Sequence, residues 1–106
     1  MLFQRTPLVM ALVLAGACSV ATAAQADVVR VESGDLTGFV KTIPGTNVRV
    51  DVFLGVPYAA APVGQNRWAS AKPAAAWRGI RQADTAPQPC KQKGQGSEDC
   101  LYVNIY

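Results

Sequence analysis

The sequence predicts a small, strand-rich fold, mostly of short antiparallel strands and proline-rich loops, with little helix after an N-terminal targeting segment. Three observations support this prediction. Apolar and polar residues alternate over several short stretches, which is typical of strands with one buried face. Seven prolines among 106 residues interrupt long regular elements. After residue 26, no stretch shows a sustained amphipathic helical period.

The first 26 residues have the composition of an export signal. Arg5 supplies a positive charge near the start, and an apolar run follows from Leu8 to Ala17. This run is too short to span a membrane, and small residues gather toward its end. A buried core helix is the alternative interpretation. We expect 1–26 to be a signal peptide and the protein to be exported, to the periplasm or outside the cell.

Two cleavage sites satisfy the preference of signal peptidase for small residues, Ala21-Thr22-Ala23 and Ala24-Gln25-Ala26. The second is favoured because Asp27 then begins a polar, foldable sequence. Cys18 offers an alternative, a lipid anchor of the bacterial lipoprotein type. The large aliphatic residue usual three positions before such a cysteine is absent, since Ala15 stands there.

Short strands are expected directly after the signal. Valines alternate with charged residues here, and clusters of glycine, serine, proline and asparagine mark the turns. The expected elements are a strand over 28–32, a turn over 33–35, a return strand over 36–40, a turn over 43–47 and a strand over 48–52. Gly38, inside the return strand, indicates a bulge or a close backbone approach. Such a sheet needs something to pack on.

The segment from Gly55 to Pro89 is expected to be a loop region, because five prolines break it up. Ala74 to Trp77 could form one helical turn, which is too short to be stable alone. Trp68 and Trp77 are interpreted as packing anchors rather than as a ligand platform.

The last predicted element is a strand over Leu101 to Tyr106, in which Leu101, Val103 and Ile105 share one face. Removing 26 of 106 residues leaves 80, at the lower edge of what one hydrophobic core can stabilise. Cys90 and Cys100 then form an even pair in an oxidising compartment, so a disulfide between them is expected. Closing so short a loop contributes roughly 2.5 to 3 kcal/mol in the chain-entropy model.

Charge excludes few functions. The net charge of +3 becomes +2 when Arg5 leaves with the signal, and both signs are interspersed. No basic cluster indicates nucleic-acid binding, and Lys91 and Lys93 are interpreted as part of a solvated loop. The chain contains no histidine, and we expect no cofactor and no metal.

Three segments, taken together in their order and spacing, resemble the beginning of a type B carboxylesterase, the cholinesterase and carboxylesterase family of the α/β-hydrolase fold. They are Phe53-Leu54-Gly55-Val56-Pro57-Tyr58-Ala59 continuing through Pro62-Val63-Gly64 to Arg67-Trp68, then Trp77-Arg78-Gly79-Ile80-Arg81-Gln82-Ala83, then Ser97-Glu98-Asp99-Cys100-Leu101-Tyr102-Val103-Asn104. The resemblance covers most of the chain after the signal.

The resemblance implies several structural features. Members of this family begin with a small antiparallel sheet, and Leu101 to Tyr106 would be an early strand of their large central sheet. The family's first disulfide falls on Cys90 and Cys100. A buried ion pair between Arg67 and Glu98 is also implied, with a structural role; the alternative is two separate surface charges.

The family's catalytic residues are missing from this sequence. Members carry a glycine-rich oxyanion loop, a Gly-x-Ser-x-Gly elbow, an acid and a histidine, all later in a much longer chain. Ser33, Ser70 and Ser97 lack the flanking glycines of the elbow, and no histidine can serve as general base. Loop 91–99 lacks the tryptophan with which cholinesterase-like members hold cationic substrates, so choline esters are not expected.

We therefore expect residues 27–106 to be the N-terminal fragment of a secreted serine carboxylesterase and to be catalytically incompetent alone. The alternative is a small secreted binding or structural module stapled by one disulfide.

Overall fold

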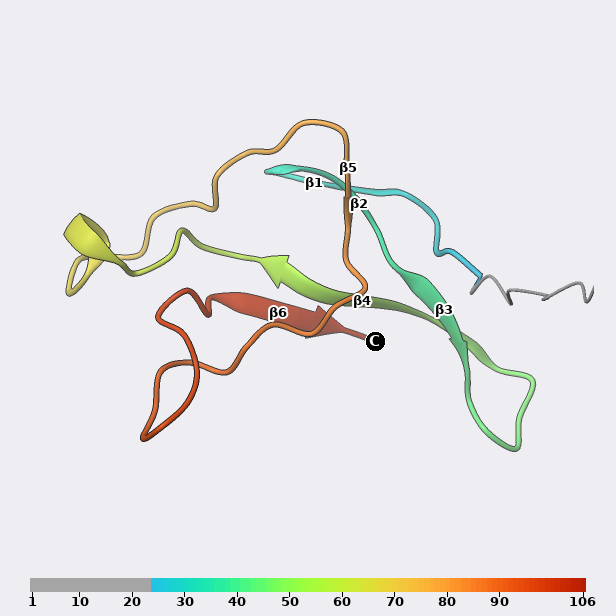
Figure 1. The fold of residues 1–106 in the computed structure, drawn as a ribbon. Coiled ribbons are helices and arrows are strands. Elements are labelled where there is room, and N and C mark those ends of the chain that lie inside the picture. The colour runs from blue at the N-terminus through green and yellow to red at the C-terminus, as the bar shows by residue number, and fades with distance from the viewer. Residues whose placement is uncertain (1–23) are drawn as a thin grey trace, which may run out of the picture.

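The computed structural model describes residues 24–106, and this part of the chain is built almost entirely from short strands and loops (Figure 1). Its elements are β1 (Val29–Val31), β2 (Gly34–Thr37), β3 (Phe39–Thr42), β4 (Arg49–Pro57), the 3-10 turn η1 (Gly64–Asn66), β5 (Ile80–Gln82) and β6 (Tyr102–Ile105). The predicted strand-rich fold is confirmed. Cys18 and the apolar run before it lie outside the described residues. Within residues 24–106, the structure contains no helix that could cross a membrane.

The strands form two three-stranded sheets, ordered β1-β2-β5 and β3-β4-β6. In the first sheet, β1 and β2 are antiparallel, whereas β2 and β5 are parallel. In the second, β4 pairs antiparallel with both β3 and β6. Figure 1 shows β6 alongside β4, although the two strands are far apart in sequence. Strand β4 is therefore the centre of the second sheet.

Gly38 separates β2 from β3, where the sequence predicted one strand over 36–40. Its backbone passes so close to β4 that a Cβ at this position would overlap the carbonyl oxygen of Val52. The predicted close backbone approach is confirmed. Because a glycine fits between the strands here, the chain can leave the first sheet and enter the second without a longer connection.

Strand β4 extends past the predicted end at residue 52 and includes Pro57. Proline is tolerated there because it is the last residue of the strand, where a lost backbone donor costs least. A register shift relative to β6 falls between Phe53 and Val56, and Gly55 has a positive φ of 68°. The side-chain oxygen of Asn104 accepts a hydrogen bond from the Gly55 N–H at 2.9 Å, so the irregularity is held by β6 itself.

Strand β5 is an element that the sequence did not predict, because it lies inside the proline-rich segment. The Ala83 N–H donates to the Thr37 carbonyl at 2.8 Å, and the Leu54 N–H donates to the Ala83 carbonyl, also at 2.8 Å. These bonds connect the end of β5 to both β2 and β4. Residues 74–77, a stretch judged too short for a stable helical turn, form no helix. Trp77 instead donates its indole N–H to the Asp35 carbonyl at 2.6 Å.

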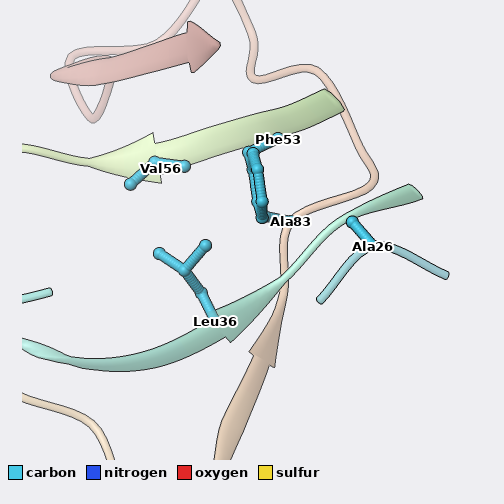
Figure 2. Close-up of a cluster of buried hydrophobic side chains, with 5 residues drawn as sticks. All are labelled: Ala26, Leu36, Phe53, Val56 and Ala83. Carbon is cyan, nitrogen blue, oxygen red and sulfur yellow. The ribbon is translucent and has the colours of Figure 1, made fainter. Parts of the chain in front are cut away.

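The core is a small cluster between the two sheets (Figure 2). Its buried members are Ala26, Leu36, Phe53, Val56 and Ala83, and Val31, Val40 and Trp77 pack against them. Trp77 is thus a packing anchor, as predicted. The predicted apolar face of β6 is not buried in this core, because Val103 and Ile105 are 41% and 46% exposed. No described element covers that face, although the alternation identified the strand itself correctly.

We expect Gly38→Ala to destabilise the fold by about 3 kcal/mol or more, because the added methyl group would have to push β2 and β4 apart. Gly45→Ala is the control. Position 45 has open space around it but a φ of 77°, so only the left-handed backbone conformation is penalised, at about 1 to 2 kcal/mol. Urea denaturation followed by tryptophan fluorescence compares the two. Equal losses would contradict the close approach at Gly38.

Candidate functional site

The C-terminal part of the chain is organised around a disulfide between Cys90 and Cys100, whose Cα atoms are 5.0 Å apart. This is the pair expected from cysteine parity and from the family resemblance. The bond closes loop 91–99 immediately before β6. At the mouth of the loop, the Ser97 N–H also donates to the Pro89 carbonyl at 2.9 Å. The position at which β6 begins is therefore fixed by both a covalent and a backbone contact.

The loop interior leaves little room beside the disulfide. Gly96 has a positive φ of 86°, and a Cβ there would meet the carbonyl oxygens of Cys90 and Pro89 at 2.5 and 2.6 Å. Only glycine satisfies both the backbone conformation and the close approach. At the tip, Gln92 and Gln95 exchange backbone hydrogen bonds of 3.0 and 3.1 Å. The loop is thus shaped mainly by its own backbone.

Arg67 and Glu98 meet across the loop, with 3.2 Å between Nη2 of the arginine and Oε1 of the glutamate. Their side chains are 55% and 39% exposed, so the structure brings the two residues together without the burial that the resemblance implied. Arg67 follows η1 on an open loop, and no other described element covers the pair. An exposed ion pair typically contributes about 0 to 1 kcal/mol, because water and salt screen it.

Trp68 does not act as the packing anchor that the sequence predicted. Its side chain is 94% exposed, and its φ of 62° is unusual for a residue other than glycine. The Arg67 guanidinium lies 5.7 Å from the centroid of the indole ring, which is a cation–π distance. Together with Lys91 and Glu98, these residues line an open hollow of about 250 Å³ beside the disulfide. This hollow has no buried polar group aimed into it.

A second group of side chains, which the sequence analysis missed, lies at the start of β6. Arg81, Asp99 and Tyr102 line two adjoining hollows of about 320 and 230 Å³. Arg81 also stacks on the Trp77 ring, with its Cζ atom 5.5 Å from the ring centroid. No sequence signal connects Arg81 to the other two, because the pairing of β5 with β2 is what brings it there.

The Asp99 carboxylate affects the ionisation of the Tyr102 hydroxyl. Hydrogen bonding to the Asp99 carboxylate raises the pKa of the Tyr102 hydroxyl above its ordinary value, and partial burial and the negative charge of Asp99 act in the same direction. The positive charge of Arg81 opposes the rise. The neutral form of the phenol is therefore favoured.

Two serine hydroxyls in the described residues are hydrogen-bonded to the backbone. The Ser33 hydroxyl donates to the Ala74 carbonyl at 3.5 Å, and the Ser97 hydroxyl accepts from the Asp99 N–H at 3.1 Å. Both of these bonds join a serine hydroxyl to the backbone, and the whole chain contains no histidine that could activate either hydroxyl. Within residues 24–106, no three acidic, cysteine or histidine residues gather in a way that could hold a metal ion.

These features define a class of protein. A small antiparallel sheet, a glycine-containing strand β4 and a disulfide directly before β6 are the opening part of an α/β-hydrolase domain. The sequence model of the Carboxylesterase family matches residues 25–106, and the chain belongs to this family. The resemblance seen in the sequence motifs is confirmed.

The relatives are carboxylesterases. Human carboxylesterase 5A is 38% identical over 90 residues, which cover 69% of this chain and 16% of that protein. Cocaine esterase from Oryctolagus cuniculus is 36% identical over 91 residues, covering 70% and 17%. The crystal structure of Geobacillus stearothermophilus carboxylesterase EST55 at pH 6.8 is similar with a TM-score of 0.59 and 38% identity, over 73% of this chain and 15% of that one. The chain thus spans less than a fifth of the length of these relatives.

We expect Glu98→Gln to lower the free energy of unfolding by less than about 1 kcal/mol, because the ion pair with Arg67 is exposed. The loss should shrink further when salt is added. Glu32→Gln, at an exposed position in the turn after β1, is the matched control. Urea denaturation at low and high salt measures both variants. A loss of about 3 kcal/mol or more would instead indicate a desolvated pair.

Tyr102 should ionise at a higher pH than an ordinary tyrosine, whose pKa is about 10. Because the folded-state pKa is raised, the stabilisation from the Asp99 contact is fully present below about pH 10 and is lost as the pH rises through the folded-state pKa. Alkaline difference spectra of the chain against Tyr102→Phe isolate this group. Asp99→Asn should lower the pKa of Tyr102. An unchanged ionisation midpoint in that variant would contradict the assigned cause.

Proposed function

We propose that this chain is the N-terminal part of an exported serine carboxylesterase. The observation that carries the proposal is the match of residues 25–106 to the carboxylesterase family, combined with the small share of each relative that the chain spans. The position of β6 beside β4, with its apolar residues Val103 and Ile105 exposed, agrees with a strand that belongs to a larger sheet.

The reaction proposed for the whole enzyme is acyl transfer. An ester would transfer its acyl group to the serine of a Gly-x-Ser-x-Gly elbow, and water would then release the acid. Backbone N–H groups of a glycine-rich loop would stabilise the oxyanion. In this scheme the 106 residues contribute the first sheet, the disulfide loop and β6, which support the site without touching the reacting atoms.

We propose that the chain alone does not hydrolyse esters. Its three serines within the described residues, Ser33, Ser70 and Ser97, lack elbow glycines, and a serine hydroxyl without a general base is a weak nucleophile. No histidine is available for that role. Ser97 lines the hollow of about 320 Å³, but its hydroxyl accepts a hydrogen bond from the Asp99 N–H, and the chain has no histidine to take its proton.

Export is proposed on two observations. The first residues have the composition of a signal peptide. The disulfide between Cys90 and Cys100 stabilises a small core and persists only in an oxidising compartment. For the substrate of the whole enzyme we propose a carboxylic ester, as the family implies. Choline esters are not proposed, because loop 91–99 carries no aromatic residue.

The purified chain should show no turnover of p-nitrophenyl acetate above the buffer rate, and a fluorophosphonate probe for active serines should not label it. A chain extended in the same reading frame through a Gly-x-Ser-x-Gly elbow and a histidine should gain both activities. In that extended chain, replacing the elbow serine by alanine should abolish labelling. Probe attached to Ser33, Ser70 or Ser97 of the short chain would overturn the proposal.

A further inference from the structure

Residues Ala24, Gln25 and Ala26 are part of the folded domain. The Val40 N–H donates to the Ala24 carbonyl at 2.9 Å, and the Ala26 N–H donates to the Gly38 carbonyl at 3.1 Å. Gln25 forms an antiparallel bridge with Phe39. The three residues therefore lie against β3 as a short additional strand segment, and they satisfy the Gly38 carbonyl and the Val40 N–H.

Ala26 has a further role in the core. It is only 6% exposed and belongs to the buried cluster with Leu36 and Phe53 (Figure 2). Its carbonyl accepts a hydrogen bond of 2.7 Å from the hydroxyl of Thr37, which is the buried polar side chain of the described residues and is 2% exposed. Without Ala26, the Thr37 hydroxyl would lose this partner inside the core, and a buried hydroxyl left unsatisfied is costly.

These contacts distinguish the two cleavage sites that the sequence allows. Cleavage after Ala26 would remove a core residue, the acceptor for Thr37 and two backbone hydrogen bonds beside Gly38. Cleavage after Ala23 would leave all of them in place. Both sites have alanine at the first and third positions before the cut, so the alanine pattern alone does not choose between them.

We propose that the processing site lies between Ala23 and Ala24, and that the mature protein begins with Ala24-Gln25-Ala26-Asp27. The inference rests on the proposed export and changes the expected signal from 1–26 to 1–23. The mature chain then retains the segment that joins the core to β3. The enzyme class that acts here is a signal peptidase with a preference for small side chains.

N-terminal sequencing and intact mass of the exported product test the site directly. The precursor is produced in a host that exports proteins, and the product is recovered outside the cytoplasm. A sequence beginning at Ala24 is expected. A product that begins at Asp27, or at Cys18 with the added mass of a lipid, would overturn this inference while leaving export intact. A precursor that stays uncut inside the cell would overturn export and this site together.

Two matched variants distinguish the two candidate cleavage sites without relying on the wild-type product. Ala23→Leu places a large side chain directly before the proposed cut, and the product beginning at Ala24 should be lost. Ala24→Leu places the same side chain directly after that cut, at an exposed position, and cleavage should remain where it is. Cleavage after Ala26 would give the opposite pattern, because Ala24 is the third residue before that cut and Ala23 lies outside the recognised positions.

Discussion

The structure depends on the close contact between Gly38 and β4. At this point the chain leaves the first sheet and enters the second, and the absence of a side chain lets the backbone pass against the Val52 carbonyl. Strand β4 then organises the rest of the described chain, because β3 and β6 pair on its two sides and the end of β5 bonds to Leu54. The core contains few residues, but it can hold the two sheets together because both sheets are already connected to β4.

Local patterns in the sequence predicted much of this fold. Alternating valines identified the strands predicted over 28–32 and 48–52, which correspond to β1 and the start of β4, and the alternation after Cys100 identified β6. Gly38 was recognised as a close approach because glycine inside a strand usually marks one. The disulfide followed from the parity of two cysteines, Cys90 and Cys100.

The features that were missed depend on contacts between distant segments. Strand β5 has three residues and no alternating pattern of its own, and it exists because β2 offers a free edge to pair with. The group of Arg81, Asp99 and Tyr102 forms for the same reason. The burial expected for Trp68 and for the Arg67–Glu98 pair was wrong within residues 24–106, because side-chain type indicates what can be buried but not which element covers it.

Loop 91–99 is closed at its mouth twice, by the disulfide and by the hydrogen bond from Ser97 to Pro89. The tip around Gln92 and Gln95 is consequently insulated from the start of β6. Changes in length or sequence at the tip are absorbed locally, while the registration of β6 against β4 stays the same. Such a loop is a position at which length and sequence can vary without disturbing the pairing of β4 with β6.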